Sequence, residues 1–233
     1  MLLVALAMVT PVQAAETGTS IDIEVQENGD ADVKIENTVG FSGKSERQAF
    51  ASISNNSTKV RKLASSTASR FRKFLNRASD QVDRNMTIED VTASTGTKGD
   101  LGVLIVKFTW TNFAQDTTAD KVTVGDVFEG GFSLEEDQSL LLGGPYPEVS
   151  TNSENGTVSG STVEWKGPAT VNENLTVTYM TQDASDSGTE KGNGSESGGD
   201  SGSGSGGNGQ PGMSIVAMFV ALAAVALISY RKR

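Results

Sequence analysis

The fold is decided by Leu101-Gly-Val-Leu-Ile-Val-Lys-Phe-Thr-Trp-Thr-Asn-Phe113, the strongest strand pattern in this 233-residue chain. Successive side chains of a strand point to opposite faces, so Leu104, Val106, Phe108 and Trp110 share one face. We therefore predict a long strand with its largest apolar side chains on one side.

Weaker strand patterns occur elsewhere in the chain. Residues 21–25 and 33–39 alternate apolar and polar side chains around an Asn28-Gly29 turn, which predicts a hairpin. Other short apolar runs predict strands at residues 86–93, 122–128, 140–142, 163–165 and 175–179.

Helical patterns lie between the hairpin and the long strand. Ser45-Glu-Arg-Gln48 matches a capping box and predicts a helix with Ser45 as its N-cap. Asn55-Asn56-Ser57 interrupts it, and a second helix follows from Thr58 to Asp83, with apolar residues spaced by three and four. This order indicates an α+β domain over residues 15–180, in which one long helix, or two, packs on one face of an antiparallel sheet.

Six aromatic residues in the strand region have two interpretations. They either line a carbohydrate or lipid pocket or fill the core, and we favour the core because they alternate on predicted strands. These residues are Phe108, Trp110, Phe113, Phe128, Phe132 and Trp165.

The composition excludes several functions. The net charge is −10, which argues against nucleic-acid binding, since contacts to phosphates need a basic face. The chain has no Cys and no His, so the usual zinc sites and Ser-His-Asp or Cys-His catalysis are excluded.

Acidic clusters are the remaining material for catalysis or metal binding. Glu135, Glu136 and Asp137 are adjacent, and Asp116 and Asp120 lie close together. A glycosidase needs two carboxylates held apart in a cleft, and the twelve-residue calcium-loop motif does not occur. We interpret these acids as solvated turns and expect no enzyme activity, no metal and no cofactor.

The predicted long helix is basic on the face opposite its apolar residues. Its most prominent positions are Arg70, Lys73 and Arg77, and the others are Arg61, Lys62, Arg72 and Arg84. Either this face is solvated and pairs with carboxylates elsewhere, or it binds an acidic polymer, lipid headgroups or a partner protein.

The C-terminal residues 211–233 read as a membrane anchor. Pro211-Gly212-Met213 precedes an uncharged apolar run that ends at Tyr230, and Arg231-Lys232-Arg233 follows. As a helix, the run from Met213 to Tyr230 would be about 27 Å long, close to the thickness of a bilayer core. The basic cluster prefers the cytoplasmic side, so we expect the domain outside the cell, at the exterior face of its membrane.

Two further segments fit this topology. Residues 1–14 resemble a secretory signal peptide, with an apolar run from Leu2 to Val9, small residues at Val12 and Ala14, and cleavage before Ala15; the alternative is an N-terminal strand. Residues 181–210 are rich in Gly, Ser and acids, which predicts a disordered linker between domain and anchor.

Six Asn-x-Ser/Thr sequons would be candidate glycosylation sites in an exported chain. They begin at Asn55, Asn56, Asn85, Asn155, Asn174 and Asn193.

The tail resembles the C-terminal sorting signals of haloarchaeal surface proteins, in which Pro-Gly-Phe precedes an apolar span and a basic cluster. This resemblance implies processing by a signal peptidase and by an archaeosortase, which replaces the apolar tail with a lipid. Here Met213 stands where Phe is usual. If processing fails, the same residues remain as one membrane helix.

The domain is similar to a haloarchaeal family of exported or membrane-anchored proteins of unknown function. Three motifs carry this resemblance, which spans roughly residues 20–180: Phe108-Thr-Trp-Thr-Asn-Phe-Ala114, Val124-Gly-Asp-Val-Phe128 and Trp165-Lys-Gly-Pro168. The resemblance implies no activity. We expect a surface protein that displays a non-catalytic binding or structural domain, or alternatively a sensing or adhesion module that acts with a separate membrane partner.

Overall fold

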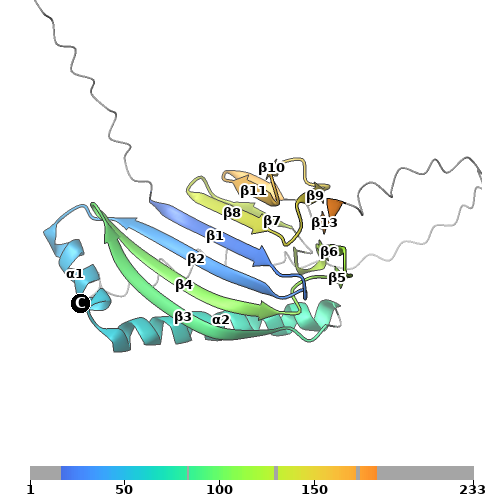
Figure 1. The fold of residues 1–233 in the computed structure, drawn as a ribbon. Coiled ribbons are helices and arrows are strands. Elements are labelled where there is room, and N and C mark those ends of the chain that lie inside the picture. The colour runs from blue at the N-terminus through green and yellow to red at the C-terminus, as the bar shows by residue number, and fades with distance from the viewer. Residues whose placement is uncertain (1–16, 83, 129–130, 172–173, 183–233) are drawn as a thin grey trace, which may run out of the picture.

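The computed structural model describes residues 17–82, 84–128, 131–171 and 174–182. They form an α+β fold with two α-helices, a mixed seven-stranded sheet and two smaller sheets (Figure 1). The α+β class predicted from the order of the patterns is therefore confirmed.

The large sheet is mixed rather than antiparallel. In spatial order its strands are β10 (Thr157–Ser159), β11 (Thr162–Lys166), β8 (Gln138–Gly143), β1 (Gly18–Val25), β2 (Ala31–Gly40), β4 (Leu101–Thr111) and β3 (Thr87–Lys98). All neighbours run antiparallel except β1 and β8, which are parallel, with Ile21 opposite Leu140. The prediction of an antiparallel sheet is wrong at this one pair, because β8 joins β1 from far along the chain rather than through a hairpin.

The first hairpin forms as predicted. β1 and β2 pair from Gly18 opposite Thr38 to Val25 opposite Ala31. Gly29 has φ +85°, a left-handed conformation that glycine adopts without strain. The Asn-Gly turn therefore sets the register of the strands that enter the core.

The two helices are α1 (Lys44–Ser54) and α2 (Ser57–Val82). The predicted break is confirmed, and the Asn56 side chain stabilises the beginning of α2 by accepting a hydrogen bond from the Lys59 backbone N–H at 3.0 Å. The predicted capping box is wrong. The N-cap of α1 is Gly43, and the Glu46 carboxylate accepts from the backbone N–H of Ser42 at 2.6 Å.

One face of the large sheet forms the core. Residues of one row lie side by side across five strands: Trp165, Leu140, Ile21, Ile35 and Val106. All five are at most 3% exposed. The helix α2 covers the end of this face that is formed by β4 and β3 (Figure 1). The centroid of its Phe71 ring lies 4.7 Å from that of Phe108 and 5.3 Å from that of Trp110.

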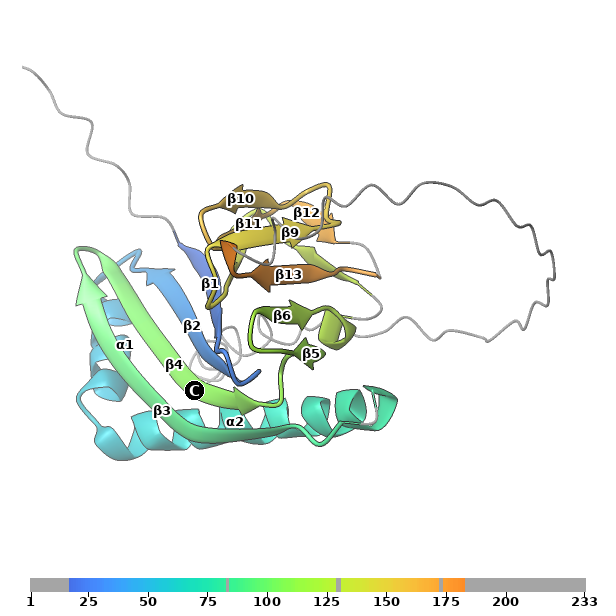
Figure 2. The same cartoon turned by 45° about the vertical axis from the view of Figure 1, so that its right-hand side comes forward.

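The smaller sheets cover the other end of the core face (Figure 2). They contain β5 (Asp116–Thr117), β6 (Lys121–Val124), β13 (Val177–Met180) and β9 (Glu148–Thr151) in one sheet, and β12 (Ala169–Val171) and β7 (Phe132–Leu134) in the other, with a 3₁₀ turn at Asp126–Phe128. The Tyr179 hydroxyl donates to the Leu142 carbonyl at 2.9 Å, and burial raises the pKa of this phenol. Trp165 Nε1 donates to the Ser153 hydroxyl at 2.8 Å.

The opposite face of the large sheet is polar. Lys34 on β2 forms ion pairs with Asp22 at 2.9 Å and with Glu36 at 3.2 Å. The hydrogen bond to Asp22 is the main cause that raises the pKa of Lys34, against the opposing effect of desolvation. Because these side chains are about one-third exposed, the pairs contribute little to stability and mark a solvated surface.

Candidate functional site

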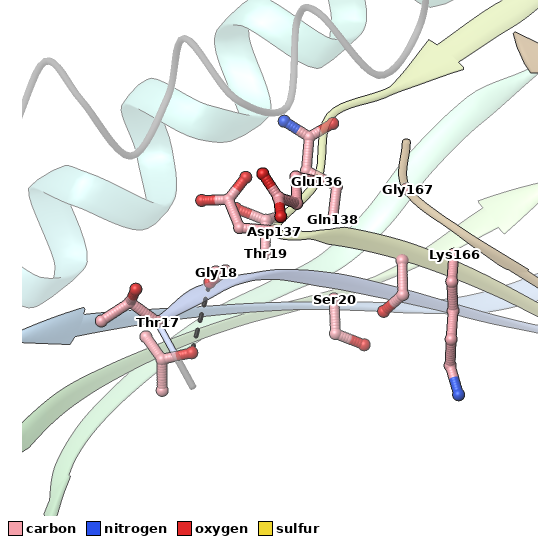
Figure 3. Close-up of a pocket in the computed structure, with 11 residues that line it drawn as sticks. Thr17, Gly18, Thr19, Ser20, Glu136, Asp137, Gln138, Lys166 and Gly167 are labelled. Atoms are coloured by element: carbon pink, nitrogen blue, oxygen red, sulfur yellow. Dashed lines mark hydrogen bonds between the residues drawn. The ribbon is translucent and has the colours of Figure 1, made fainter. Parts of the chain in front are cut away.

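A polar hollow of about 670 Å³ opens where β1 and β8 begin (Figure 3). Residues from four places meet there: the start of β1, Thr38 of β2, the turn and first residues of β8, and the end of β11. The lining residues are Thr17, Gly18, Thr19, Ser20, Thr38, Glu136, Asp137, Gln138, Ser139, Lys166 and Gly167. The hollow therefore offers carboxylates, hydroxyls, one amide and one ammonium group.

A tight turn places the acids of this hollow. The Gln138 backbone N–H donates to the Glu135 carbonyl at 3.0 Å, and the Gln138 side chain accepts from the Glu135 backbone N–H at 3.1 Å. The side chains of Glu136 and Asp137 are exposed between these anchors. The interpretation of this acidic run as a solvated turn agrees with its exposure.

Two glycines let other segments approach that turn. A Cβ on Gly18 would overlap the backbone oxygen of Asp137, and a Cβ on Gly167 would overlap that of Glu135. Backbone hydrogen bonds use the same proximity, since Thr19 N donates to Asp137 O at 2.9 Å and Gly167 N to Gln138 O at 2.8 Å. Only residues without a side chain fit these positions.

A row of buried polar side chains lies beside the hollow. Thr19, Asn37 and Gln138 are at most 9% exposed and lie next to one another across β2, β1 and β8. The Thr19 hydroxyl donates to Asn37 Oδ1 at 2.8 Å. Among the described residues, the buried side-chain nitrogen without a hydrogen-bond partner is Trp110 Nε1, which lies outside this row.

The carboxylates of Asp116 and Asp120 have partners within the domain. Asp116 pairs with Lys121 at 3.2 Å, and Asp120 accepts from the Thr118 hydroxyl at 2.7 Å. Within the described ranges, no group of three or more Asp or Glu residues is arranged to hold an ion.

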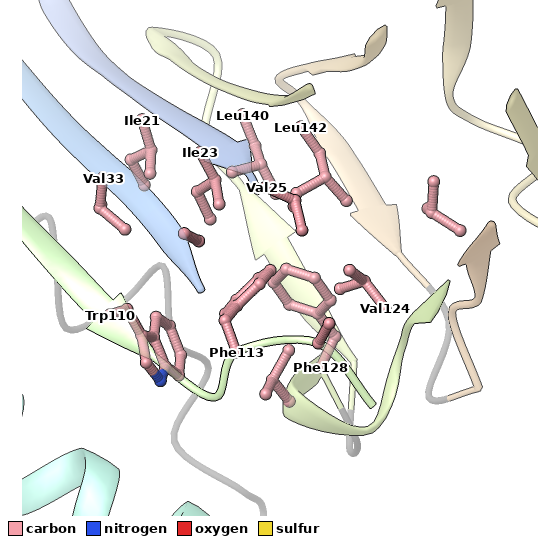
Figure 4. Packing of buried hydrophobic residues seen from close by; sticks show 14 of the residues in the cluster. Ile21, Ile23, Val25, Val33, Trp110, Phe113, Val124, Phe128, Leu140 and Leu142 are labelled. Atoms are coloured by element: carbon pink, nitrogen blue, oxygen red, sulfur yellow. The ribbon is translucent and has the colours of Figure 1, made fainter. Parts of the chain in front are cut away.

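The six aromatic residues are core residues, as we favoured. Each is at most 3% exposed. Five of their rings form a series, in which the ring of Trp110 is followed by those of Phe113 and Phe128 at centroid distances of 4.7 and 6.1 Å (Figure 4). The series continues from Phe128 to Phe132 at 5.6 Å and from Phe132 to Trp165 at 6.4 Å. The alternative of a carbohydrate or lipid pocket lined by these rings is therefore wrong.

The basic face of α2 is described only in part. The side chains of Arg70, Lys73 and Arg77 lie outside the described part of the structure, whereas Arg61, Lys62 and Arg72 are exposed. Among the described side chains, no ion pair involves a residue of α2. Pairing of this face with carboxylates elsewhere in the domain thus has no support among those side chains.

Arg84, just after α2, joins the large sheet to the smaller sheets, a role that the sequence did not reveal. Its guanidinium pairs with both Asp126 oxygens at 2.6 and 3.0 Å, and it donates to the carbonyls of Asn112 at 2.7 Å and Phe113 at 3.0 Å. Asn112 has φ +52°, and its backbone N–H donates to Asp30 Oδ1 at 2.8 Å. The Trp-Thr-Asn-Phe-Ala motif and the Val-Gly-Asp-Val-Phe motif therefore meet as one structural junction.

Five of the six sequons lie on the described surface. The asparagines at positions 55, 56, 85, 155 and 174 are exposed, and Asn193 lies outside the described residues. Asn155 Nδ2 already donates to the Thr170 carbonyl at 2.8 Å, so a glycan there would replace a hydrogen bond.

The predicted signal peptide, linker and anchor also lie outside the described residues. These segments include Pro211-Gly212-Met213 and Arg231-Lys232-Arg233. No helix in the described part of the chain is both long and apolar enough to cross a membrane.

The fold is an α+β domain. Its two distinctive sequence motifs, residues 108–114 and 124–128, contribute to the core and to the junction at Arg84. The chain belongs to the family described as domain of unknown function DUF7345, whose model matches residues 22–146. The predicted membership in a family of unknown function is confirmed for these residues, and the Trp165-Lys-Gly-Pro168 motif lies beyond them. A search of curated proteins found no match.

Proposed function

We propose that this chain is an exported cell-surface protein that is anchored at its C-terminus and displays a non-catalytic binding or structural domain. The observation that carries the proposal is the position of the α+β domain between an apolar segment that ends before Ala15 and a second apolar segment that begins after Gly212. A chain with an N-terminal secretory signal and a C-terminal stop-transfer anchor has this arrangement.

The chemistry of the domain supports binding rather than catalysis. The chain has no His or Cys, and its distinctive aromatic and glycine residues have structural contacts. The residues left for recognition are exposed: the hydroxyl and carboxylate groups of the polar hollow and the basic face of α2. No catalytic step is therefore assigned to this domain.

The proposed processing follows from the resemblance of the tail to haloarchaeal sorting signals. A signal peptidase would cut before Ala15, and an archaeosortase would act near Pro211-Gly212-Met213. The domain would then be held outside the cell by a lipid, or by the apolar helix if the tail is kept. Before any processing, Arg231-Lys232-Arg233 would lie in the cytoplasm.

An alternative function is a sensing or adhesion module that pairs with a separate membrane protein. The basic face of α2 favours it, because exposed cations such as Arg61, Lys62 and Arg72 form no ion pair within the described part of the domain. An acidic region of a partner would supply the missing counter-charge.

Mass spectrometry of the chain isolated from native membranes tests the proposal. We expect an N-terminus at Ala15 and a C-terminus that either carries a lipid near Gly212 or extends to Arg233, with glycans at some of the exposed sequons. An unmodified chain that begins at Met1 and fractionates as a soluble protein would contradict the proposal. Co-purification of a stoichiometric membrane protein would favour the alternative function.

A further inference from the structure

We propose that Asn55 is the N-glycosylation acceptor among the five sequons that the structure describes, because its tripeptide alone is open to an enzyme that acts on the folded domain. This inference rests on the proposed export, which brings the chain to such an enzyme outside the cytoplasm. The substrate that supplies the sugar is an oligosaccharide activated as a phosphate ester of a membrane lipid.

The transfer forms one bond and breaks another. The Asn55 Nδ2 attacks the anomeric carbon of the sugar, the bond from this carbon to the phosphate oxygen breaks, and the lipid phosphate leaves. The amide nitrogen gives one proton to a base of the enzyme. Because the sequon requires Ser or Thr two positions after the asparagine, the enzyme must also reach that hydroxyl. An acceptor therefore needs three accessible residues in a row, with a free amide and a free hydroxyl.

The corner between the two helices meets these needs. Asn55 is the C-cap of α1, Ser57 is the first residue of α2, and Asn56 between them belongs to neither helix. All three residues are exposed. The Asn55 side-chain amide and the Ser57 hydroxyl have no hydrogen-bond partner among the described residues. This tripeptide can therefore enter an active site without the loss of a bond from either reacting side chain.

The overlapping sequon at Asn56 is part of the beginning of α2. The Asn56 Oδ1 accepts from the Lys59 backbone N–H at 3.0 Å, and the Asn56 carbonyl accepts from the Val60 N–H at 3.1 Å. The hydroxyl of this sequon belongs to Thr58, in the first turn of the helix. Use of Asn56 would therefore pull that turn out of its helical conformation and remove its cap.

The sequon at Asn85 is built into the large sheet. Its middle residue, Met86, is 4% exposed and belongs to the core. Its third residue, Thr87, is paired with Thr111 of β4, and the two hydroxyl oxygens lie 2.9 Å apart. An enzyme could take this tripeptide only from a chain that has not yet folded.

The last two described sequons are held by the smaller sheets and their loops. The middle residue after Asn174 is Leu175, which is 3% exposed. The Asn155 Nδ2, the nitrogen that would attack the sugar, donates to the Thr170 carbonyl at 2.8 Å. Each of these sequons therefore lacks one of the features that the corner at Asn55 combines.

Two neighbouring substitutions test this inference by glycopeptide mass spectrometry of the full chain from native membranes. Ser57→Ala abolishes the sequon at Asn55 but keeps the one at Asn56, whose third residue is Thr58. Thr58→Ala does the reverse. Both positions are exposed, so neither change disturbs the core. We expect the sugar on Asn55 in the unmodified and Thr58→Ala chains, and its loss in the Ser57→Ala chain.

Sugar that persists in Ser57→Ala, or that disappears in Thr58→Ala, would assign the acceptor to Asn56 and overturn the inference. Occupancy of Asn85 or Asn174 equal to that of Asn55 would also overturn it, because modification would then precede folding. A bare Asn55 in a membrane-bound chain that begins at Ala15 would overturn the inference and leave the proposed export untouched. A soluble chain that begins at Met1 would instead contradict the proposed export itself.

Discussion

Replacement of Phe113 by alanine should lower the free energy of unfolding by about 4 kcal/mol. Phe113 is 0% exposed, and its ring contacts those of Trp110 and Phe128 edge to face (Figure 4). It follows the last strand residue of β4 by two positions and so connects the core under α2 with the core under the smaller sheets. Its loss would leave a cavity at this connection, together with the loss of two aromatic contacts.

Denaturant unfolding of the purified chain measures this effect, with Phe41→Ala as the control. Phe41 also contacts another ring, that of Phe50 with a centroid distance of 5.4 Å, but it is only half-buried just before the beginning of α1. We expect the control to lose less than half as much stability. Equal losses for the two variants would show that the ring series does not join the two parts of the core.

Replacement of Arg84 by methionine should cost about 3 kcal/mol. The Arg84 and Asp126 side chains are each 19% exposed, and the guanidinium donates to Asp126 and to the carbonyls of Asn112 and Phe113. Methionine keeps much of the length of the side chain but leaves the Asp126 carboxylate and two carbonyls without their donor. Truncation of a partly buried pair costs more than the pair itself contributes, because the remaining charge stays desolvated.

The matched control for Arg84 is Arg47→Met. Arg47 forms an ion pair of the same length with Asp100, 2.6 Å, but the two side chains are 53% and 84% exposed. Exposed pairs contribute about 0–1 kcal/mol, so the control should unfold almost like the unmodified chain. If both substitutions cost equally little, Arg84 does not hold the junction. A second substitution, Asp126→Leu, should recover part of the loss in the Arg84→Met background.

Local patterns predicted the elements whose causes are local. The Asn28-Gly29 turn, the break before Ser57 and the strand that begins at Leu101 each depend on neighbouring residues, and all three occur in the structure. The helix start at Ser45 failed because Glu46 bonds to Ser42 and thereby fixes the beginning of α1 at Lys44.

Long-range pairings were not accessible from the sequence. The parallel pairing of β1 with β8 depends on two distant apolar strands that share one core face, as in the opposition of Ile21 and Leu140. The sequence also did not predict five strands of two to four residues, because segments this short show no clear alternation of apolar and polar residues. These strands are β5, β7, β9, β10 and β12.

Only part of the candidate site could be predicted from the sequence. Glu136 and Asp137 stood out as acids, but their neighbours Thr17 and Lys166 come from distant segments that meet only in the folded sheet. Arg84 was assigned to the basic face of the helix, although its guanidinium turns to Asp126 at the junction. The side-chain positions of Arg70, Lys73 and Arg77 lie outside the described part of the structure.

The proposed location of the domain outside the cell is tested most directly by labelling an introduced thiol in intact cells. The chain has no cysteine, so Ser159→Cys, at an exposed position on β10, creates a single thiol. Val163→Cys is the control, because Val163 is 0% exposed and should react only after denaturation. We expect a membrane-impermeant maleimide to label Ser159→Cys in intact cells to the same extent as in lysed cells. Labelling that appears only after lysis would contradict a domain displayed outside the membrane.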